Sequence, residues 1–353
     1  MRDSAFLSPS AIDLATPTLI NQLLNCELRL AFERDLETSK PSGKLPSQVI
    51  GIAKHYMIEA AYKFTSNSSE ANKKYFENEW DSFIVTQLAD MKSEWLPSTV
   101  PEPESWPNYF LERTKTIRRC VEISTRVKKS SVSLLEGTGI ESWIEDPASI
   151  LCGRPDRISI EVDGIRIIDL KPGDASREIT TDQIRQLQIY GFIYFQKFGV
   201  LPNALTIERI DGSQEDISFT FDEIKALAHH ALTAVKAFNS EVVEKTRKPV
   251  STPGVENCKW CPYKLECSDY WSNVESSWGH PSIFGEILSS GESDQGNHVD
   301  LRVISPTDRF AELKRVIGLP VSFESGRLKI VDLQISPDNE TLRTRWSSRY
   351  SLE

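Results

Sequence analysis

The sequence lacks any long hydrophobic run and any large excess of positive charge. No run of about 18 apolar residues occurs, so no membrane-spanning helix is expected. The N-terminal residues contain no long apolar segment of the kind that marks a secretory signal, so we expect a cytoplasmic protein. The formal net charge of −10 excludes a histone-like protein that is basic over its whole surface. A local basic groove for nucleic acid stays compatible with that charge, because only the field at the site matters.

Length and composition indicate two domains with sizeable cores. The chain length corresponds to about two domains of ordinary size. Hydrophobic residues make up 39% and charged residues 26% of the chain, close to globular averages. We predict a larger domain over residues 1–275 and a small accessory β domain over residues 281–353, which could form an OB-like barrel.

The pattern of apolar residues predicts an α/β fold for the larger domain. Helical periodicity comes first in the chain, and runs of β-branched residues follow it. We predict helices over about residues 8–35, 47–64, 71–96, 109–135, 181–198 and 221–247, and strands over 140–144, 150–162, 165–170, 204–210 and 216–220. In the small domain we predict a loop over 289–297 and strands over 284–288, 299–304, 321–323, 328–335 and 342–350.

The dipeptide Asp163-Gly164 is a strong signal for a two-residue hairpin turn. With this turn, Lys171 lies opposite Asp156, and Asp169 lies opposite Ile158. Because side chains alternate between the faces of a strand, one face carries both acids and the lysine. The same face carries Ile158, Ile160, Val162, Ile165 and Ile167. We therefore expect two acids and one lysine at the open end of a core-facing surface.

These three charged residues suit a site for a divalent metal ion. Charges are costly to bury unless they are paired or bind a metal. Asp156 and Asp169 would lie about 7–8 Å apart at the backbone, so their carboxylates could share one cation. Lys171 could orient or help to activate an attacking water and offset developing charge. The alternative is a surface salt bridge between Lys171 and Asp156 at a strand end.

The same residues resemble the signature of a known family. Pro155-Asp156 followed by Asp169-Leu170-Lys171 is similar to the motif of the PD-(D/E)XK nuclease superfamily. Gln186 and Tyr190, at i and i+4 on the next predicted helix, resemble the Q-x-x-x-Y motif of its RecB-like branch. The segment from Gly51 to His55 resembles the G-x-x-x-H helix of that branch, whose histidine is a metal ligand.

The resemblance implies a fold, a set of metal ligands and a set of catalytic residues. It covers residues 7–272 and implies a restriction-endonuclease-like core, in which helices flank a mixed central sheet. The implied ligands of Mg²⁺ or Mn²⁺ are His55, Asp156, Asp169 and the Leu170 carbonyl. The implied catalytic set is Asp156, Asp169, Lys171, Gln186 and Tyr190, the last two contacting DNA or supporting the site. From the local pattern alone, His55 lies off the apolar stripe of its helix and could be a solvent-exposed histidine.

The cysteines form a second group of candidate ligands. Cys258, Cys261 and Cys267 have the spacing of a compact thiolate cluster, and Cys26 is the most plausible fourth member. Four thiolates suit either zinc or an iron–sulphur cluster, and clustered thiols in a reducing compartment more often bind metal than pair. The pattern is similar to that of the iron–sulphur RecB-like nucleases, which include CRISPR-associated exonucleases, and so implies a [4Fe–4S] cluster with zinc as the alternative.

Three residues depart from that pattern of cysteines or lie outside it. Glu27 follows the first cysteine, where members of that group often have proline. Cys120 and Cys152 are left over, and we expect both to be buried thiols.

The resemblance implies a metal-dependent DNA nuclease. We expect an exonuclease that acts on single-stranded DNA ends in repair, recombination or phage defence. The alternative is a non-catalytic DNA-binding or scaffold subunit of a helicase–nuclease or defence complex. The sequence has no G-x-x-x-x-G-K-[ST] motif, so any ATP-driven unwinding must come from a partner protein.

Two basic segments are further candidates for contact with nucleic acid. Residues 113–129 carry seven basic side chains and one acid, a density that can follow a phosphate backbone. The alternative for this segment is a solvated helix that balances the acidic remainder. In the small domain, one tryptophan lies among three arginines: Arg343, Arg345, Trp346 and Arg349. This mixture of an aromatic and basic side chains weakly favours binding to single-stranded nucleic acid.

Overall fold

The computed structural model describes two compact units that are interleaved in the sequence. The described residues are 7–35, 44–64, 68–94, 100–127, 139–171, 176, 178–275, 278–293, 296–306, 310, 312–336 and 341–353. Unit 1 draws its residues from Met1–Ala11, Gln22–Pro41 and Phe238–Glu353, and unit 2 from Ile12–Asn21 and Ser42–Ala237. The predicted division into 1–275 and 281–353 stays a prediction. Among the described residues, no helix is long and apolar enough to cross a membrane.

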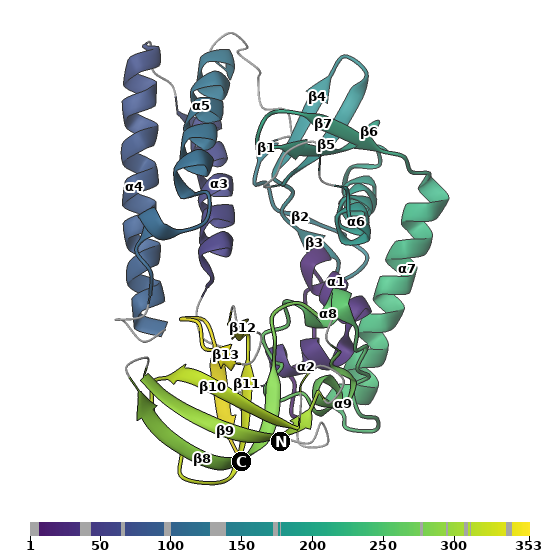
Figure 1. The fold of residues 1–353 in the computed structure, drawn as a ribbon. Helices are drawn as coiled ribbons and strands as arrows, with labels where there is room; N and C mark the ends of the chain where they lie inside the picture. The colour runs from purple at the N-terminus through teal and green to yellow at the C-terminus, as the bar shows by residue number, and fades with distance from the viewer. Residues whose placement is uncertain are drawn as a thin grey trace. The chain divides into compact units, whose positions relative to one another are not determined.

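Unit 2 is built around a five-stranded sheet with the order β1-β4-β5-β6-β7 (Figure 1). Its strands are β1 (Gly139–Ile140), β4 (Arg157–Glu161), β5 (Gly164–Lys171), β6 (Ala204–Arg209) and β7 (Gln214–Ile217). Neighbouring strands are antiparallel except β5 and β6, which are parallel. Parallel neighbours need a long crossover, which helix α6 (Thr181–Phe198) supplies. A separate short pair joins β2 (Ile144–Glu145) to β3 (Cys152–Gly153).

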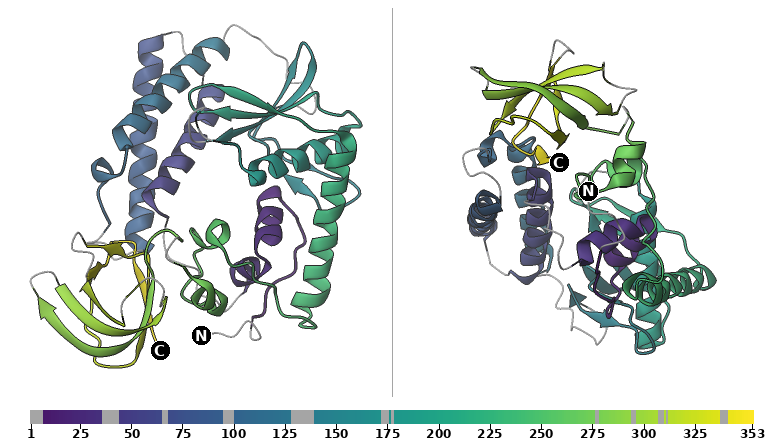
Figure 2. Two further views of the ribbon diagram at one scale, coloured as in Figure 1. Left: turned by 45° about the vertical axis from the view of Figure 1, so that its right-hand side comes forward. Right: turned by 90° about the horizontal axis from the view of Figure 1, so that it is seen from below.

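Helices flank this sheet. Helix α6 packs on β5 and β6, and α7 (Phe221–Ala237) packs on α6. Three further helices pack against one another and run side by side (Figures 1 and 2): α3 (Pro46–Lys63), α4 (Ser69–Glu94) and α5 (Tyr109–Val127). A short 3₁₀ turn, η3 (Pro103–Ser105), precedes α5. The mixed sheet with its helices confirms the predicted α/β core.

The ends of α6 follow from its sequence. Thr180 and Gln183 form a capping box at the start, in which each side chain bonds the backbone N–H of the other residue. Gly199 ends the helix in the left-handed conformation, at φ 71°, which glycine adopts without steric cost. These signals explain why the predicted range 181–198 matches the helix. The buried side chains of its middle turns, Leu187, Ile189 and Ile193, face the core.

Unit 1 joins the cysteine segment to a seven-stranded sheet, which is strongly curved (Figure 2). Its helices are α2 (Glu27–Arg34), the π-helix η4 (Phe238–Val243), α8 (Val255–Cys258) and α9 (Ser268–Asn273). The strands, in the sheet order, are β12 (Gln334–Ile335), β13 (Thr341–Arg343), β10 (Leu313–Leu319), β9 (Gly296–Ser305), β8 (Ile283–Ser293), β11 (Arg327–Val331) and β14 (Arg349–Leu352). The predicted C-terminal β domain is therefore present, while its OB-like character stays a prediction.

Several predicted elements were wrong in detail. The first helix, expected from about residue 8 to 35, is two helices, α1 (Pro17–Asn25) and α2, because Cys26 adopts an extended backbone. The strand expected over 321–323 is irregular, and β10 was not predicted. Most of the loop expected over 289–297 belongs to β8 and β9, which pair as one long hairpin. The part of the predicted helix 109–135 beyond Val127 lies outside the described residues.

Candidate active site

The hairpin that carries the two acids has a different register from the predicted one. Glu161 pairs with Gly164, so the turn residues are Val162 and Asp163, rather than Asp163 and Gly164. The predicted pairing of Lys171 with Asp156 is therefore wrong by two residues. A shift of two keeps each side chain on its predicted face, but Ile160 at the end of β4 and Val162 in the turn are exposed rather than core-facing, because both lie where the hairpin extends into solvent. Continued by one residue beyond β4, the register places Asp156 opposite Asp169.

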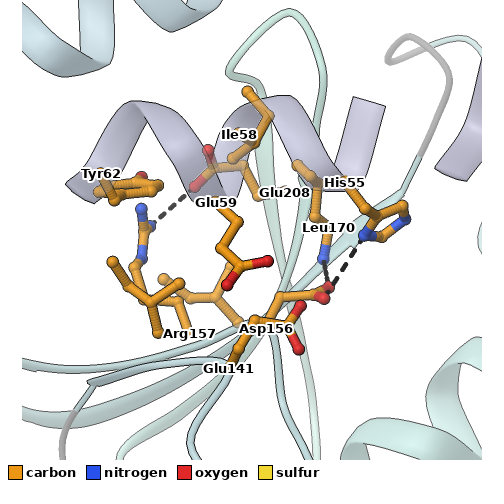
Figure 3. Close-up of a pocket in the computed structure, with 11 residues that line it drawn as sticks. His55, Ile58, Glu59, Tyr62, Glu141, Asp156, Arg157, Leu170 and Glu208 are labelled. Atoms are coloured by element: carbon orange, nitrogen blue, oxygen red, sulfur yellow. Dashed lines mark hydrogen bonds and ion pairs between the residues drawn. The ribbon is translucent and has the colours of Figure 1, made fainter. Parts of the chain in front are cut away.

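Asp156 connects the strands to helix α3. Its Oδ2 accepts a hydrogen bond from the backbone N–H of Leu170 at 2.5 Å. Its Oδ1 lies 3.4 Å from His55 Nδ1, and Figure 3 shows both side chains at one side of a shared pocket. Burial lowers the pKa of His55, but the hydrogen bond and the negative charge of Asp156 outweigh it, so the pKa is raised. The structure thus brings His55 to the predicted site rather than leaving it in open solvent.

Asp169 and Lys171, on the same face of β5, form an ion pair in which the carboxylate is buried. The Asp169 side chain is nearly inaccessible, and its Oδ2 lies 2.6 Å from Lys171 Nζ. Burial raises the pKa of the Asp169 carboxyl and the Asp156 charge adds to this, while Lys171 opposes both. Lys171 Nζ also donates a hydrogen bond to Gln186 Oε1 at 3.1 Å. Lys171 therefore pairs with Asp169, and not with Asp156 as the surface salt-bridge alternative required.

Tyr190 supports the segment that leads into Asp156. Its hydroxyl donates a hydrogen bond to the Arg154 carbonyl at 3.1 Å, and burial raises its pKa. A Cβ on Gly153 would lie 2.7 Å from the Tyr190 ring, so only glycine allows this close approach. Gln186 and Tyr190 lie on one face of α6, as predicted. In this geometry Gln186 holds Lys171, and Tyr190 holds the backbone before Asp156.

Sequence reasoning missed several residues of the pocket drawn in Figure 3. Alongside His55 and Asp156, it is lined by charged and aromatic side chains: Glu59, Tyr62, Glu141, Arg157 and Glu208. Glu208 is buried on β6, and its two carboxylate oxygens bond Arg119 and Arg157. An acid within the fully buried strand β6 was the available signal, but its arginine partners are distant in sequence.

Three of the five described basic residues in the segment 113–129 are paired within the protein. Arg113 bonds Asp81, Arg118 lies 3.9 Å from Glu122, and Arg119 bonds Glu208. Lys128 and Lys129 lie outside the described residues. These pairs favour the alternative in which the helix balances acidic residues over the one in which it tracks a phosphate backbone.

The four predicted cysteine ligands surround one cavity in unit 1. Cys26, Cys258, Cys261 and Cys267 all line it, and all are free thiols. Burial raises the pKa of Cys267 to about 12 and raises the pKa values of Cys258 and Cys261. Cys120 and Cys152, the two cysteines outside the predicted ligand set, are buried elsewhere, as expected.

The residue after Cys26 fastens α2 to the segment before the cysteines. Glu27 accepts hydrogen bonds from the Arg247 guanidinium and from the Val250 N–H. The Leu28 N–H donates to the Val250 carbonyl at 2.9 Å. Glu27, which departs from the family's usual proline, therefore has a structural role of its own here.

As described, neither the acid site nor the cysteine cavity has the geometry of a metal-binding site. Among the described residues, no three or more His, Cys, Asp or Glu side chains are arranged so that they could hold a metal ion. The donor types at the acid site nevertheless fit Mg²⁺ or Mn²⁺, since they are carboxylates and an imidazole. Asp169 Oδ2 is buried and faces the Lys171 ammonium at 2.6 Å, so a cation bound by this carboxylate would share it with Lys171.

Comparison with known proteins identifies the family. A family model described as the PD-(D/E)XK nuclease superfamily matches residues 15–268. This chain belongs to the PD-(D/E)XK nuclease superfamily. No curated protein matches the sequence. Its D-x-K segment, Asp169–Lys171, and the preceding Pro155-Asp156 lie inside the matched region.

Two solved structures are similar to this PD-(D/E)XK chain. One is a protein from Eubacterium rectale provisionally named an exonuclease, with 12% sequence identity and a TM-score of 0.38; the match covers 74% of this chain and 89% of that one. The other is SSO0001, with 14% identity and a TM-score of 0.27, covering 64% of this chain and 97% of that one. At these TM-scores neither likeness carries an argument about fold or function.

Proposed function

We propose that this PD-(D/E)XK protein is a metal-dependent deoxyribonuclease of the RecB-like branch, an exonuclease that acts on single-stranded DNA ends. The observation that carries the proposal is the meeting of Asp156, Asp169 and Lys171 at the ends of β4 and β5, with His55 reaching Asp156 from α3. Family membership supports the reaction class, and the residues of the family motif support its location.

The roles of the residues follow from their contacts. His55, Asp156, Asp169 and the Leu170 carbonyl would hold Mg²⁺ or Mn²⁺, which when bound lowers the pKa of a water and polarises a phosphate. Asp156 is oriented by the Leu170 N–H and His55, so its carboxylate cannot rotate freely. Lys171 orients the attacking water and offsets charge that develops on the phosphate.

Two residues of α6 hold this arrangement in place. Gln186 accepts the hydrogen bond that fixes Lys171 Nζ, and Tyr190 fixes the backbone two residues before Asp156. Both lie on a helix with defined caps at each end, so their positions are set by rigid structure rather than by a loop. Support of the site is the role that these contacts favour over direct contact with DNA.

For the four cysteines we propose a structural [4Fe–4S] cluster, with zinc as the alternative. The shared cavity of Cys26, Cys258, Cys261 and Cys267 supports a common ligand. Such a group would reinforce the tie between α2 and the segment after η4, which the Glu27 bonds already make. The preference for iron over zinc rests on the resemblance to the iron–sulphur RecB-like nucleases.

A second candidate function is a non-catalytic DNA-binding or scaffold subunit. The observation in its favour is that no metal-holding group is formed among the described residues, and that oxygens of both acids are engaged within the protein. In that case the chain would work only with a helicase or defence-complex partner. The same partner is compatible with an active nuclease.

One experiment separates the two functions. Purified full-length protein is incubated with DNA labelled at either end, single-stranded or double-stranded, with Mg²⁺, Mn²⁺ or EDTA. A nuclease gives cleavage that needs the divalent ion, and an exonuclease gives mononucleotides or short products progressing from one labelled end. Single-stranded DNA should be the better substrate. Binding without cleavage under every metal condition would select the scaffold function.

A further inference from the structure

An exposed tryptophan lies within the cysteine cluster. Trp260 stands between Cys258 and Cys261, and its side chain is 64% exposed. Lys259 Nζ lies 5.3 Å from the centre of the Trp260 ring, and the His280 ring meets it nearly edge-on at 6.5 Å. Tryptophan is usually buried for most of its surface, so a ring presented to solvent beside cationic side chains points to a binding surface.

The surface around Trp260 carries net positive charge. Arg345 Nη1 lies 2.7 Å from His280 Nε2. A guanidinium can only donate, so His280 Nε2 must accept and the imidazole is neutral. The pKa of His280 is also lowered, which agrees with a neutral ring. Burial and the Arg345 charge lower this pKa and outweigh the charge of Asp332, which raises it. The positive charge therefore resides on Lys259 and Arg345, while Asp332, the acid that acts on His280, pairs with Lys264 and Arg349 instead.

The surface is held rigidly to the β sheet. Lys264 pairs with Asp332 at 2.8 Å, and Arg349 donates a hydrogen bond to the Pro262 carbonyl. Gly279, at φ 90°, lets Lys259 lie close, since a Cβ there would be 3.1 Å from the Lys259 side chain. The backbone that carries Trp260 is therefore anchored, so little of its conformational entropy is lost when a ligand binds.

We propose that Trp260, with Lys259 and Arg345 beside it, is a stacking site for single-stranded nucleic acid. The proposal rests on the DNA-binding role proposed above. Every base presents a flat face that can stack on an aromatic ring, and the phosphates beside it suit the two cations. An apolar protein partner fits less well, because it would bury both charges without neutralising them.

The test uses the full-length protein and a fluorescein-labelled dT20 strand, with EDTA present so that no cleavage occurs. Fluorescence anisotropy should show that Trp260→Ala weakens binding about tenfold, while Trp260→Phe stays within about threefold of wild type. The matched control is Phe110→Ala, which removes an aromatic side chain of similar exposure, 61%, from unit 2. Bound iron or zinc is measured in each variant, so that loss of the cluster is not mistaken for loss of stacking.

A second set of measurements separates stacking from charge. On a strand of the same length in which the bases are replaced by abasic sites, Trp260→Ala should have no effect. Lys259→Gln should reduce the slope of log affinity against log salt by about 0.7, the value for one phosphate contact on a single strand. This variant also tests the surface if Trp260→Ala fails to fold.

The outcomes distinguish this inference from the proposed function. Equal dT20 affinity of wild type, Trp260→Ala and Lys259→Gln would overturn the stacking site, while metal-dependent cleavage by the same preparations would leave the nuclease intact. Conversely, selective loss of dT20 binding in the Trp260 and Lys259 variants supports the stacking site even if no cleavage is seen.

Discussion

Asp156 Oδ2 accepts a hydrogen bond from the backbone N–H of Leu170, which lies between Asp169 and Lys171 in the chain. This bond fixes the first acid of the motif against the D-x-K segment. It depends on the observed register, because that register brings Asp156 opposite Asp169. The other oxygen of Asp156 faces His55, so one side chain links α3 to the central strands.

The first prediction concerns the buried acid. Asp169→Asn keeps the shape of the side chain but removes its charge, so metal-dependent cleavage should fall about 100-fold or more. The fold should persist, since no large side chain is added or removed, and circular dichroism with thermal unfolding checks this. The control is Asp163→Asn, which neutralises a largely exposed acid in the turn of the same hairpin. Wild-type cleavage by a pure Asp169→Asn preparation would contradict the assignment of the site.

The second prediction separates Lys171 from the proposed metal ligands. Lys171→Gln removes a charge that stabilises the reacting phosphate, so the maximal rate should fall about 100-fold while the Mg²⁺ concentration for half-maximal rate stays the same. His55→Gln should instead raise that Mg²⁺ concentration, because it alters a ligand. Magnesium titrations of cleavage rate measure both quantities. An identical response of the two variants would argue against distinct roles.

Local signals made part of this fold predictable from the sequence. Helix α6 was predicted with its observed bounds because Thr180, Gln183 and Gly199 specify its caps through neighbouring residues. The faces of β4 and β5 were also predicted, because alternation survives a register shift of two. The break at Cys26 carries neither proline nor glycine, and β10 contains Lys314 and Arg315, so neither element had a clear local signal.

The remainder depends on contacts between residues distant in sequence. The motif located Asp156, Asp169, Lys171 and His55, but not the Lys171–Gln186 bond or the choice of Asp169 as the partner of Lys171. Those require the register and the position of α6 on the sheet. The sequence favoured Asp163-Gly164 as the turn of the hairpin. In the structure the turn residues are Val162 and Asp163, and Gly164 begins β5 with a positive φ.

A third prediction tests the conformation of Gly164 at the start of β5. Gly164 has φ 125°, and a Cβ there would lie 1.9 Å from Asn203 Oδ1, which accepts a hydrogen bond from Ile165. Gly164→Ala should therefore lower the free energy of unfolding by about 1–3 kcal/mol, through backbone strain and the displaced Asn203. Gly199→Ala is the matched control, because φ is 71° but nothing lies within 4 Å; it should cost about 1 kcal/mol. Urea denaturation measures the free energy of unfolding of both variants. An equal loss in the two would show that the displaced Asn203 contributes nothing.

The fourth prediction concerns the cysteine cavity. Cys261→Ser removes one of the four thiols that line it, so the protein should lose its bound iron and its brown colour, and unit 1 should become less stable. Elemental analysis and thermal unfolding measure these effects. Cys120→Ser, a change at a buried thiol outside the cavity, should retain the iron. A wild-type protein that contains zinc and no iron would select the zinc alternative.

Glu208 is the basis of the last prediction. Its carboxylate is buried and lies 2.9 Å from Arg119 and 2.8 Å from Arg157, with a third bond from Gln214. Burial raises the pKa of Glu208, but the Arg157 charge and the bonds from Gln214 and Arg119 outweigh it and hold the pKa below its usual range. Because the folded pKa is below the unfolded one, the carboxylate stabilises the fold above the unfolded pKa. That contribution is lost as the pH falls through the folded pKa.

Glu208→Ala leaves Arg157 without this counter-ion and leaves Arg119 with only its longer, 3.5 Å contact to Glu122, so it should lower the free energy of unfolding by about 3–5 kcal/mol at pH 7. The difference from wild type should shrink as the pH falls below about 4.3, where the unfolded wild-type carboxyl takes up a proton. Urea denaturation at several pH values measures both effects. Asp216→Asn neutralises a largely exposed carboxylate that pairs with Arg166 on the same sheet, and Arg166 keeps Glu161 as a partner, so stability should change by less than about 1 kcal/mol. A Glu208→Ala deficit that is constant from pH 7 to pH 3 would show that lost packing, and not the buried charge, accounts for it.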